Sequence, residues 1–378
     1  MKRGAKMKIL TAIDSMKGSL SSIEANQIIA DIFTKEGHQV QQVAIADGGE
    51  GTVDAVVKNN NGQKIAAHVQ ALDGKKIIAH FGWFETEKLA VIESAAASGI
   101  QFLNGTVRTH PKNTSSYGTG QLILAAIDHG AQTIIIGLGG TGTVDGGIGL
   151  LNALGIEFYD KDQQKLSAKG SNLANIHSFS KKRLDPRIAK INFQIAADVK
   201  SPLTGATGAV KMFGQQKGIS QSELTDYELA MKYYQRLVIK EEHSVPGDGA
   251  AGGLGFAIRT FLHGTSRSGF EFISEQTDLE NLIQQVDLVV TGEGKMDKQS
   301  LQGKVPVGIG RIAKKYGVPV IAFAGTFSGD ETQFQEEGIS VIIPIIDQIT
   351  TLEEAMNGAR ENLRRASKRT IRLVTLFN

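Results

Sequence analysis

Five stretches of the chain place acids, lysines and hydroxyl residues beside glycines, directly after short apolar runs. The first runs from Asp14 to Leu20 and the second from Ala46 to Thr52. The third covers 136–147, the fourth begins at Ala196, and the fifth covers 290–304. In open parallel sheets, ligands bind at the carboxyl ends of the strands. We therefore expect the five segments to converge on one rim that carries the chemistry.

The first two segments combine charge with tight turns. We expect a helix to start at Ser19, where free N–H groups attract an anion, and Lys17 to add a catalytic point charge. An ordinary capped turn explains this segment equally well. Asp47 and Glu50 lie in a glycine turn, and Mg²⁺ usually takes one or two carboxylates plus phosphate oxygens, so we expect both to bind metal. The predicted substrate or phosphate ligands of the first segment are Asp14, Ser15, Gly18 and Ser19.

The third segment carries a G-x-G-x-x-G pattern at Gly137, Gly139 and Gly142. The pattern alone is weak evidence for a dinucleotide site, which needs a following helix and an acid about 20 residues on, and Asp160 sits in a polar stretch. We favour a phosphate cradle in which exposed N–H groups form an anion nest. The predicted ligands are Gly139, Gly140, Thr141, Thr143 and Asp145, with Tyr117 from an upstream hydroxyl-rich stretch that opens a helix.

The last two segments supply the predicted base and further lysines. Asp198 follows a buried run, where a catalytic base could stand. Further along the chain we expect Lys217 to act in catalysis by pairing with the substrate carboxylate or the moving phosphoryl group. In the fifth segment we expect Lys295 to act in catalysis and Asp297 to bind metal. The other predicted ligands of this segment are Gly292, Glu293, Gln299, Ser300 and Lys304.

These residue types suit phosphoryl transfer to an alcohol. Mg²⁺ and lysines neutralise charge, N–H groups hold phosphates, and a carboxylate accepts the alcohol's proton. No Gly-Lys pair precedes Ser or Thr, which excludes a Walker A loop, and the protein-kinase motifs His-Arg-Asp and Asp-Phe-Gly are absent. Two other classes stay open, a nicotinamide-dependent hydroxy-acid dehydrogenase and a non-catalytic regulator that binds an acidic metabolite.

Composition limits the number of domains and the kinds of partner that we expect. The 378 residues suggest two or three domains, and a net charge of +2 gives no field that steers nucleic acid or an anionic membrane. The absence of cysteine excludes disulfides. We expect a cytoplasmic protein with a small-molecule substrate, and the sequence leaves homo-oligomerisation open. We also expect Met7 to be an alternative start, with residues 2–6 a disordered leader.

The elements that position these segments follow from hydrophobic periodicity. Apolar runs at both chain ends predict strands over 8–13, 40–46, 286–290, 318–322 and 339–345. Helical spacing is found between them, over 19–35, 52–58, 305–316 and 352–374. The middle of the chain instead predicts antiparallel strands over 64–69, 76–84 and 89–92, followed by buried strands over 134–136 and 193–196.

We therefore predict an α/β protein of two domains. A Rossmann-like parallel-sheet domain is formed by both chain ends, residues 1–62 and 285–378. A mixed α/β domain, residues 63–284, is inserted into it.

The motifs together resemble the type I glycerate kinase family. They occur in the family's order from about residue 8 to the end and are specific as a set. They are 14–20, 46–52, 93–95, 117–120, 137–147, 198–205, 213–218, 249–255 and 291–303. The resemblance implies ATP- and Mg²⁺-dependent phosphorylation of D-glycerate, to 2-phosphoglycerate or its 3-phospho isomer, in glycerate, glyoxylate or sugar-acid catabolism. It also implies two α/β domains, one of them Rossmann-like.

Several positions depart from the family pattern. Val144 removes an amide beside Asp145, which leaves the role of that loop less defined. Lys295 replaces Arg and so keeps the charge but loses the bidentate fork. The other departures are Met16, Gly142, Ser201 and Gln215. No acid is lost, so the implied activity stands.

Overall fold

The computed structural model describes residues 6–46, 48–240 and 245–376. The chain divides into two compact units, each with its own sheet. The terminal unit comprises Met1–Asp47, Asp54–Asn61 and Phe270–Asn378, and the inserted unit comprises Gly48–Val53 and Gly62–Gly269. Residues 2–5 of the expected leader and the predicted metal ligand Asp47 lie outside the described residues.

The terminal unit is built on a five-stranded parallel sheet in the order β13-β12-β11-β1-β2. Its strands are β1 (Lys8–Ile13), β2 (Gln39–Gln42), β11 (Leu288–Met296), β12 (Val320–Phe327) and β13 (Val341–Pro344). Its helices are α1 (Ser22–Lys35), α2 (Thr52–Asn59), α9 (Gly269–Gln276), α10 (Leu279–Gln284), α11 (Val305–Lys315), α12 (Glu331–Glu336), α13 (Leu352–Asn357) and α14 (Ala359–Leu376). The boundary between the units falls within the first turns of α2 and α9.

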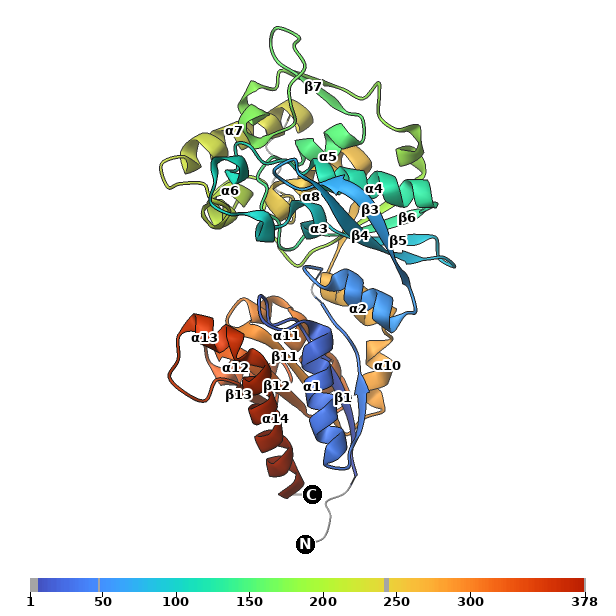
Figure 1. Cartoon of the computed structure of the whole chain (residues 1–378), viewed down its shortest axis with the longest axis vertical. Coiled ribbons are helices and arrows are strands. Elements are labelled where there is room, and N and C mark those ends of the chain that lie inside the picture. Colours follow the sequence, from blue (N-terminus) through green and yellow to red (C-terminus); the bar gives the residue numbers. More distant parts are fainter. Residues whose placement is uncertain (1–5, 47, 241–244, 377–378) are drawn as a thin grey trace. The chain divides into compact units, whose positions relative to one another are not determined.

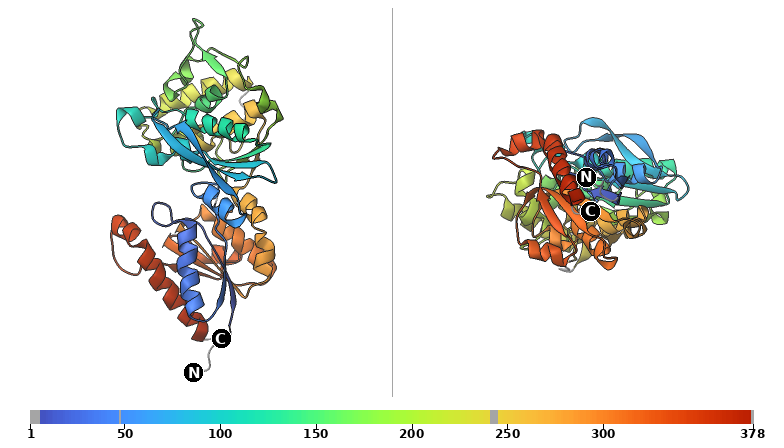
Figure 2. Two further views of the ribbon diagram at one scale, coloured as in Figure 1. Left: turned by 45° about the vertical axis from the view of Figure 1, so that its right-hand side comes forward. Right: turned by 90° about the horizontal axis from the view of Figure 1, so that it is seen from below.

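The sheet of the terminal unit joins both ends of the chain. In β1, Ile9 pairs with Leu288 of β11 on one side and with Val40 of β2 on the other. The helices α1 (blue) and α14 (red) lie side by side in both ribbon views (Figures 1 and 2), and residues of both belong to one buried cluster with β1, β11 and β12. Apolar faces of helices that are far apart in sequence thus close this core.

The inserted unit contains a mixed six-stranded sheet in the order β10-β9-β6-β5-β4-β3. Its strands are β3 (Gln63–Gln70), β4 (Lys76–Phe84), β5 (Leu89–Glu93), β6 (Thr133–Gly137), β9 (Asn192–Ala196) and β10 (Thr265–Arg267), and β7 (Glu157–Tyr159) and β8 (Ser178–Ser180) form a separate hairpin. The first three strands are antiparallel and the strands from β5 to β10 are parallel. Its helices are α3 (Ala95–Ser98), α4 (Tyr117–His129), α5 (Ile148–Ala153), α6 (Ala209–Phe213), α7 (Leu224–Ile239) and α8 (Leu254–Leu262).

The α/β class is confirmed, and several predicted boundaries are wrong for local reasons. The first helix starts at Ser22, not at Ser19, because Ser21 caps it in a reciprocal box with Glu24. The predicted strand over 40–46 ends at Gln42. The expected helix over 352–374 is interrupted at Gly358, which ends α13 before α14 begins.

The end of the inserted unit also lies earlier than residue 284. Phe270 belongs to the terminal unit and packs so closely on α11 that a Cβ on Gly308 would lie 2.4 Å from its ring. The helix α10 packs on α11 as well. Near the start of the insertion, residues 48–53 join the inserted unit, since the Val53 N–H donates to the Glu93 carboxylate at 2.7 Å.

Candidate functional site

The terminal unit has a topological switch point between β1 and β11. From β1 the chain continues to β2 on one side, and from β11 it continues through β12 to β13 on the other. In such sheets, ligands bind outside the carboxyl ends of the strands at the position where the order reverses. The turn after β1 meets β11 here, because the Asp14 N–H donates to the Gly292 carbonyl at 2.9 Å. A Cβ on Gly294 would lie 3.3 Å from the α-carbon of Met16, so the turn lies close over the strand.

The turn after β1 is closed on itself. Met16 and Leu20 form an isolated β-bridge, and both the N–H and the hydroxyl of Ser19 donate to the Met16 carbonyl at 2.8 Å. Lys17 and Gly18 are exposed at the tip, with Gly18 at φ +78°. Anion binding by a helix start at Ser19 is therefore not available, and the group that this turn offers to a ligand is the Lys17 ammonium.

Two acid–lysine pairs lie at the end of β11. The Glu293 carboxylate, 6% exposed, is 3.7 Å from Lys304 Nζ, and Lys295 Nζ is 2.9 Å from the Asp297 carboxylate. Burial opposes ionisation of Asp297, but hydrogen bonds from the Lys295 side chain and from Gln299 N–H outweigh it and lower its pKa. Gly292, Glu293 and Lys295 belong to β11 itself and not to a turn after it.

Ser300 supports this end of the strand from the interior. It is fully buried, and its hydroxyl accepts a hydrogen bond from the Asp297 N–H at 3.1 Å. Ser300 therefore supports the backbone at Asp297 from the interior.

The predicted residues of the third and fourth segments lie in the other sheet, after β6 and β9. The segments therefore do not share the rim of a single sheet, because the strands that end in them belong to two separate sheets. The loop after β6, residues 137–147, is called the glycine loop below.

The glycine loop is packed by backbone contacts on both sides. Added Cβ atoms on Gly137 and Gly139 would lie 2.3 and 2.4 Å from the Gly48 carbonyl oxygen and the Gly49 α-carbon. Farther along, a Cβ on Gly252 would lie 2.1 Å from the Thr143 carbonyl. The motif 249–255 is thus a surface against which the loop packs, which explains the number of glycines in both segments.

Several N–H groups of the glycine loop already have partners. Gly142 donates to Ser98 at 2.8 Å and Gly146 to Gly252 at 3.0 Å. Only Gly139 and Gly140 are half-buried, and the other loop residues are buried. The expected nest of exposed N–H groups over the whole loop is wrong, because packing against the neighbouring segments uses them. A ligand can reach the loop only at Gly139 and Gly140, and there the Gly139 N–H donates to the Gly48 carbonyl in a long hydrogen bond of 3.4 Å.

Asp145 connects the glycine loop to two helices. Its fully buried carboxylate accepts hydrogen bonds from the N–H and hydroxyl of Ser116 at 2.7 and 2.8 Å, and from the N–H groups of Gly147 and Gly149 at 3.0 and 3.3 Å. These donors lie at the starts of α4 and α5, where positive helix-dipole ends favour an anion. Burial raises the pKa of the Asp145 carboxyl, and the four donors oppose that rise.

Lys217 is also interior. It is 4% exposed, and its ammonium donates to the Thr141 hydroxyl at 3.2 Å and to the Thr143 carbonyl at 3.0 Å. Burial lowers the pKa of this lysine to about 8, while the charge of Asp145 opposes the fall. Thr143, Asp145 and Lys217 therefore support the loop in this arrangement, and the expected direct contact with substrate is not compatible with their burial.

Asp198, the predicted base, is held near the surface of the inserted unit. It lies two residues beyond β9, half-buried, and one carboxylate oxygen accepts from the Ser268 hydroxyl at 2.7 Å and the Gly269 N–H at 3.0 Å. Tyr117, half-buried, is the first residue of α4, next to Ser116. Sequence reasoning missed Ser268, which has no motif around it, and Ser116, which lies within the hydroxyl-rich stretch before α4.

The two predicted metal ligands that the structure describes come from different units. Among residues 6–46, 48–240 and 245–376 no group of three or more His, Asp or Glu side chains could hold a metal ion. Glu50 is exposed in the inserted unit, and Asp297 lies in the terminal unit. Because Mg²⁺ is usually bound through only one or two carboxylates plus phosphate oxygens, single acids of this kind still fit it.

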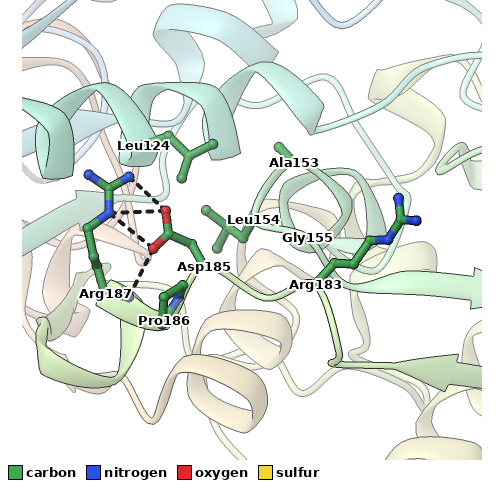
Figure 3. A pocket seen from close by; sticks show the side chains of 8 residues that line it. All are labelled: Leu124, Ala153, Leu154, Gly155, Arg183, Asp185, Pro186 and Arg187. Atoms are coloured by element: carbon green, nitrogen blue, oxygen red, sulfur yellow. Dashed lines mark hydrogen bonds and ion pairs between the residues drawn. The ribbon is translucent and has the colours of Figure 1, made fainter.

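The inserted unit also has a hollow of about 500 Å³ (Figure 3). Arg187 in its wall is bonded to Asp185 and to Asp128, so its charge is already compensated. The lining residues, none of them a predicted site residue, are Leu124, Ala153, Leu154, Gly155, Arg183, Asp185, Pro186 and Arg187. We assign no catalytic part to this hollow.

Comparisons with known proteins agree on one family. The model of the glycerate kinase family matches residues 9–375. A glycerate 2-kinase from Escherichia coli is 40% identical over 368 residues, and a glycerate kinase from Bacillus cereus is 38% identical over 370, each with 96% of both chains covered. A crystal structure assigned as glycerate kinase 2 from Salmonella typhimurium LT2 covers 98% of both chains at 35% identity, with a TM-score of 0.81. Within the described residues no helix is long and apolar enough to cross a membrane.

Proposed function

The chain belongs to the glycerate kinase family, a family of phosphotransferases, and from this premise we propose that it phosphorylates D-glycerate with ATP and Mg²⁺ to give 2-phosphoglycerate. Membership sets aside the dehydrogenase and the non-catalytic regulator. The choice of the 2-hydroxyl is supported by the name of the Escherichia coli relative.

The observation that carries the proposal is the arrangement at the switch point of the terminal unit. There Lys17 stands exposed on a self-closed turn and makes no ion pair within the described residues. The pairs Glu293–Lys304 and Lys295–Asp297 lie on the adjacent strand end. A phosphoryl-transfer site needs cations that can contact a multiply charged phosphate chain, and Lys17 meets that need without breaking an existing pair.

We assign phosphate binding to Lys17 and to the half-buried Gly139 and Gly140. Lys295 and Lys304 can leave their carboxylate partners for the substrate carboxylate or for the transferred phosphoryl group. An ammonium is a compact point charge with three donors, so it can follow a moving group.

Asp198 is the proposed base. Its carboxylate is oriented by Ser268 and the Gly269 N–H, so it can accept the proton of the attacking glycerate hydroxyl in a fixed direction. Bound Mg²⁺ would neutralise charge on the phosphate oxygens. We assign its ligation, directly or through water, to Asp297, Glu50 and Asp47. Asp297 fits this role because its lowered pKa keeps it charged, and Glu50 because it is exposed.

A coupled assay tests the proposed function. Purified protein is mixed with ATP, Mg²⁺ and D-glycerate, and enolase with pyruvate kinase reports 2-phosphoglycerate directly. A fast signal without phosphoglycerate mutase supports both the activity and the 2-hydroxyl. A signal that requires the mutase moves the phosphate to the 3-hydroxyl. If neither condition yields ADP above a control without glycerate, the proposed substrate is wrong.

A further inference from the structure

Lys217 is placed differently from every other lysine assigned to the site. It ends the short 3₁₀ helix η5 (Gln215–Lys217), is 4% exposed, and directs its ammonium to two positions of the glycine loop. We propose that Lys217 is a positioning residue, which holds the stretch from Thr141 to Thr143 so that Gly139 and Gly140 keep the geometry needed to bind phosphate. This inference rests on the proposed function only for its effect on catalysis.

The glycine loop needs such a donor at Thr143. Its carbonyl is buried, and the backbone of Gly252 lies so close that an added Cβ would be 2.1 Å away. The neighbouring hydrogen bonds of the loop, from Gly142 to Ser98 and from Gly146 to Gly252, lie on either side and leave this carbonyl to the Lys217 ammonium. A buried carbonyl that loses its donor costs about 1–3 kcal/mol. The stretch between these two backbone hydrogen bonds therefore depends on Lys217.

The same ammonium also orients a hydroxyl. Thr141 Oγ1 accepts from Lys217 at 3.2 Å, so the proton of this hydroxyl points elsewhere and remains available as a donor. Thr141 follows directly on the half-buried Gly140. The contact thus fixes the residue next to the part of the loop that a ligand can reach.

Charge extends the effect of Lys217 beyond these two contacts. Asp145 lies on the same loop and its four hydrogen-bond donors are neutral groups, while Lys217 is near enough for the Asp145 charge to oppose the fall in its pKa. Removal of a nearby positive charge makes the burial of a carboxylate more costly. Since Asp145 holds the starts of α4 and α5, a neutral side chain at position 217 loosens the loop together with both helix starts.

The test compares Lys217→Met with Lys211→Met. Lys211 is an exposed lysine of α6 in the same segment, so the control makes the same substitution without a buried contact. Amide deuterium uptake is followed by mass spectrometry in the protein without ligand, and kcat and the two KM values are measured in the coupled assay. Uptake in α14 of the terminal unit is the internal reference.

For K217M we expect faster uptake over residues 137–150 and a kcat about 10²-fold lower, the order of loss that a 1 Å misplacement causes. We expect the KM for glycerate to change less than kcat, and wild-type values for K211M. Wild-type uptake and kcat in K217M would overturn the proposal. A KM for glycerate raised tenfold or more with unchanged uptake would also overturn it, since that result means direct contact with substrate.

Thr141→Val provides a second variant if K217M does not fold. It removes one acceptor of the ammonium with little change in volume, and it should raise uptake over the same loop without affecting α14. Unchanged uptake in folded T141V would refute the positioning role. Since uptake is measured without ligand, a wild-type protein that lacks glycerate kinase activity would refute the proposed function and leave this comparison intact.

Discussion

Lys17 and Lys217 are both expected to bind anions, yet their surroundings are opposite. Lys17 stands exposed on a turn of the terminal unit that closes on itself, whereas Lys217 is buried in the inserted unit against the glycine loop. The same contrast holds for their neighbourhoods. In the terminal unit, Lys295 is 68% exposed at a strand end, and in the inserted unit Thr143 and Asp145 are fully buried.

The difference teaches that residue type at a strand end does not by itself define a ligand contact. An exposed ammonium can neutralise a phosphate, but a buried one that already donates to two oxygens stabilises a backbone shape. We therefore expect changes in the exposed group to alter binding and catalysis, and changes in the buried group to alter stability as well.

The largest effect is expected for Asp198→Asn. An amide of the same shape cannot accept the hydroxyl proton, so kcat should fall by about 10²–10⁴, the usual contribution of a general base. The melting temperature should stay close to that of the wild-type protein. Asp145→Asn is the matched buried variant and should instead lower the melting temperature strongly, because its carboxylate serves four donors. Wild-type turnover in D198N would remove Asp198 from the mechanism.

The next largest effect is expected on stability, where two glycines with positive φ can be compared. Gly252 (φ +70°) faces the Thr143 carbonyl, at 2.1 Å from an added Cβ, whereas Gly18 (φ +78°) would meet only the end of the Met356 side chain at 2.8 Å. A left-handed Ala costs about 1–2 kcal/mol in either place. Gly252→Ala adds a backbone clash, so we expect about 3 kcal/mol or more for it.

This comparison can be followed separately in the two units. Trp83 is the only tryptophan of the chain and belongs to the inserted unit, so its fluorescence reports the unfolding of that unit. G252A should shift the Trp83 transition far more than G18A does. Equal shifts would show that the glycine loop can move away from the motif 249–255 at little cost.

A smaller effect on catalysis is expected for Lys17→Met. Loss of one hydrogen bond to a charged group costs about 1.5–3 kcal/mol, so kcat/KM for ATP should fall by about ten- to hundredfold. Stability should not change, since Lys17 is exposed, and Lys17→Arg should recover most of the loss. Lower stability in K17M would mean that this lysine has the same kind of role as Lys217.

The smallest expected effect is on acid stability. In the inserted unit, hydrogen bonds from Lys112 and Ser220 lower the pKa of Glu223 from 4.5 to about 2. A lowered folded-state pKa stabilises the fold above the unfolded value, and this contribution is lost as the pH falls from about 4.5 toward 2. In Glu223→Gln, the stability of the inserted unit, followed by Trp83 fluorescence, should therefore depend less on pH in this range. Asp347→Asn, at an ion pair of the terminal unit, should leave it unchanged.

The hydrophobic pattern predicts the strands and helices of both chain ends, because the central strands are continuous buried runs and the helices bury one regular face. It fails where a single local contact decides the boundary. The first helix starts at Ser22 because Ser21 and Glu24 form a capping box there, while the Ser19 hydroxyl donates to the Met16 carbonyl in the preceding turn. Gly358 ends α13, although helix-forming residues continue on both sides of it.

The sequence predicts which segments contribute to the site, but not which role each residue has in it. An acid and a lysine after a strand look the same in sequence whether they face solvent or the interior. Lys217 lies in a polar stretch between Gln216 and Gly218, which gives no sign of burial. The glycines of the loop predict exposed N–H groups, but Gly137 and Gly252 are needed because other backbones approach them.

The pairing of β1 with β11 has a consequence for the order in which the protein acquires its structure during translation. The strands are linked by a hydrogen bond from the Thr291 hydroxyl to the Ala12 carbonyl, across 279 positions of sequence. The ribosome therefore completes the whole inserted unit before β1 meets its central neighbour. Since domains generally fold as units during synthesis, the inserted unit is expected to fold first, while the earliest-made strand waits for the last third of the chain.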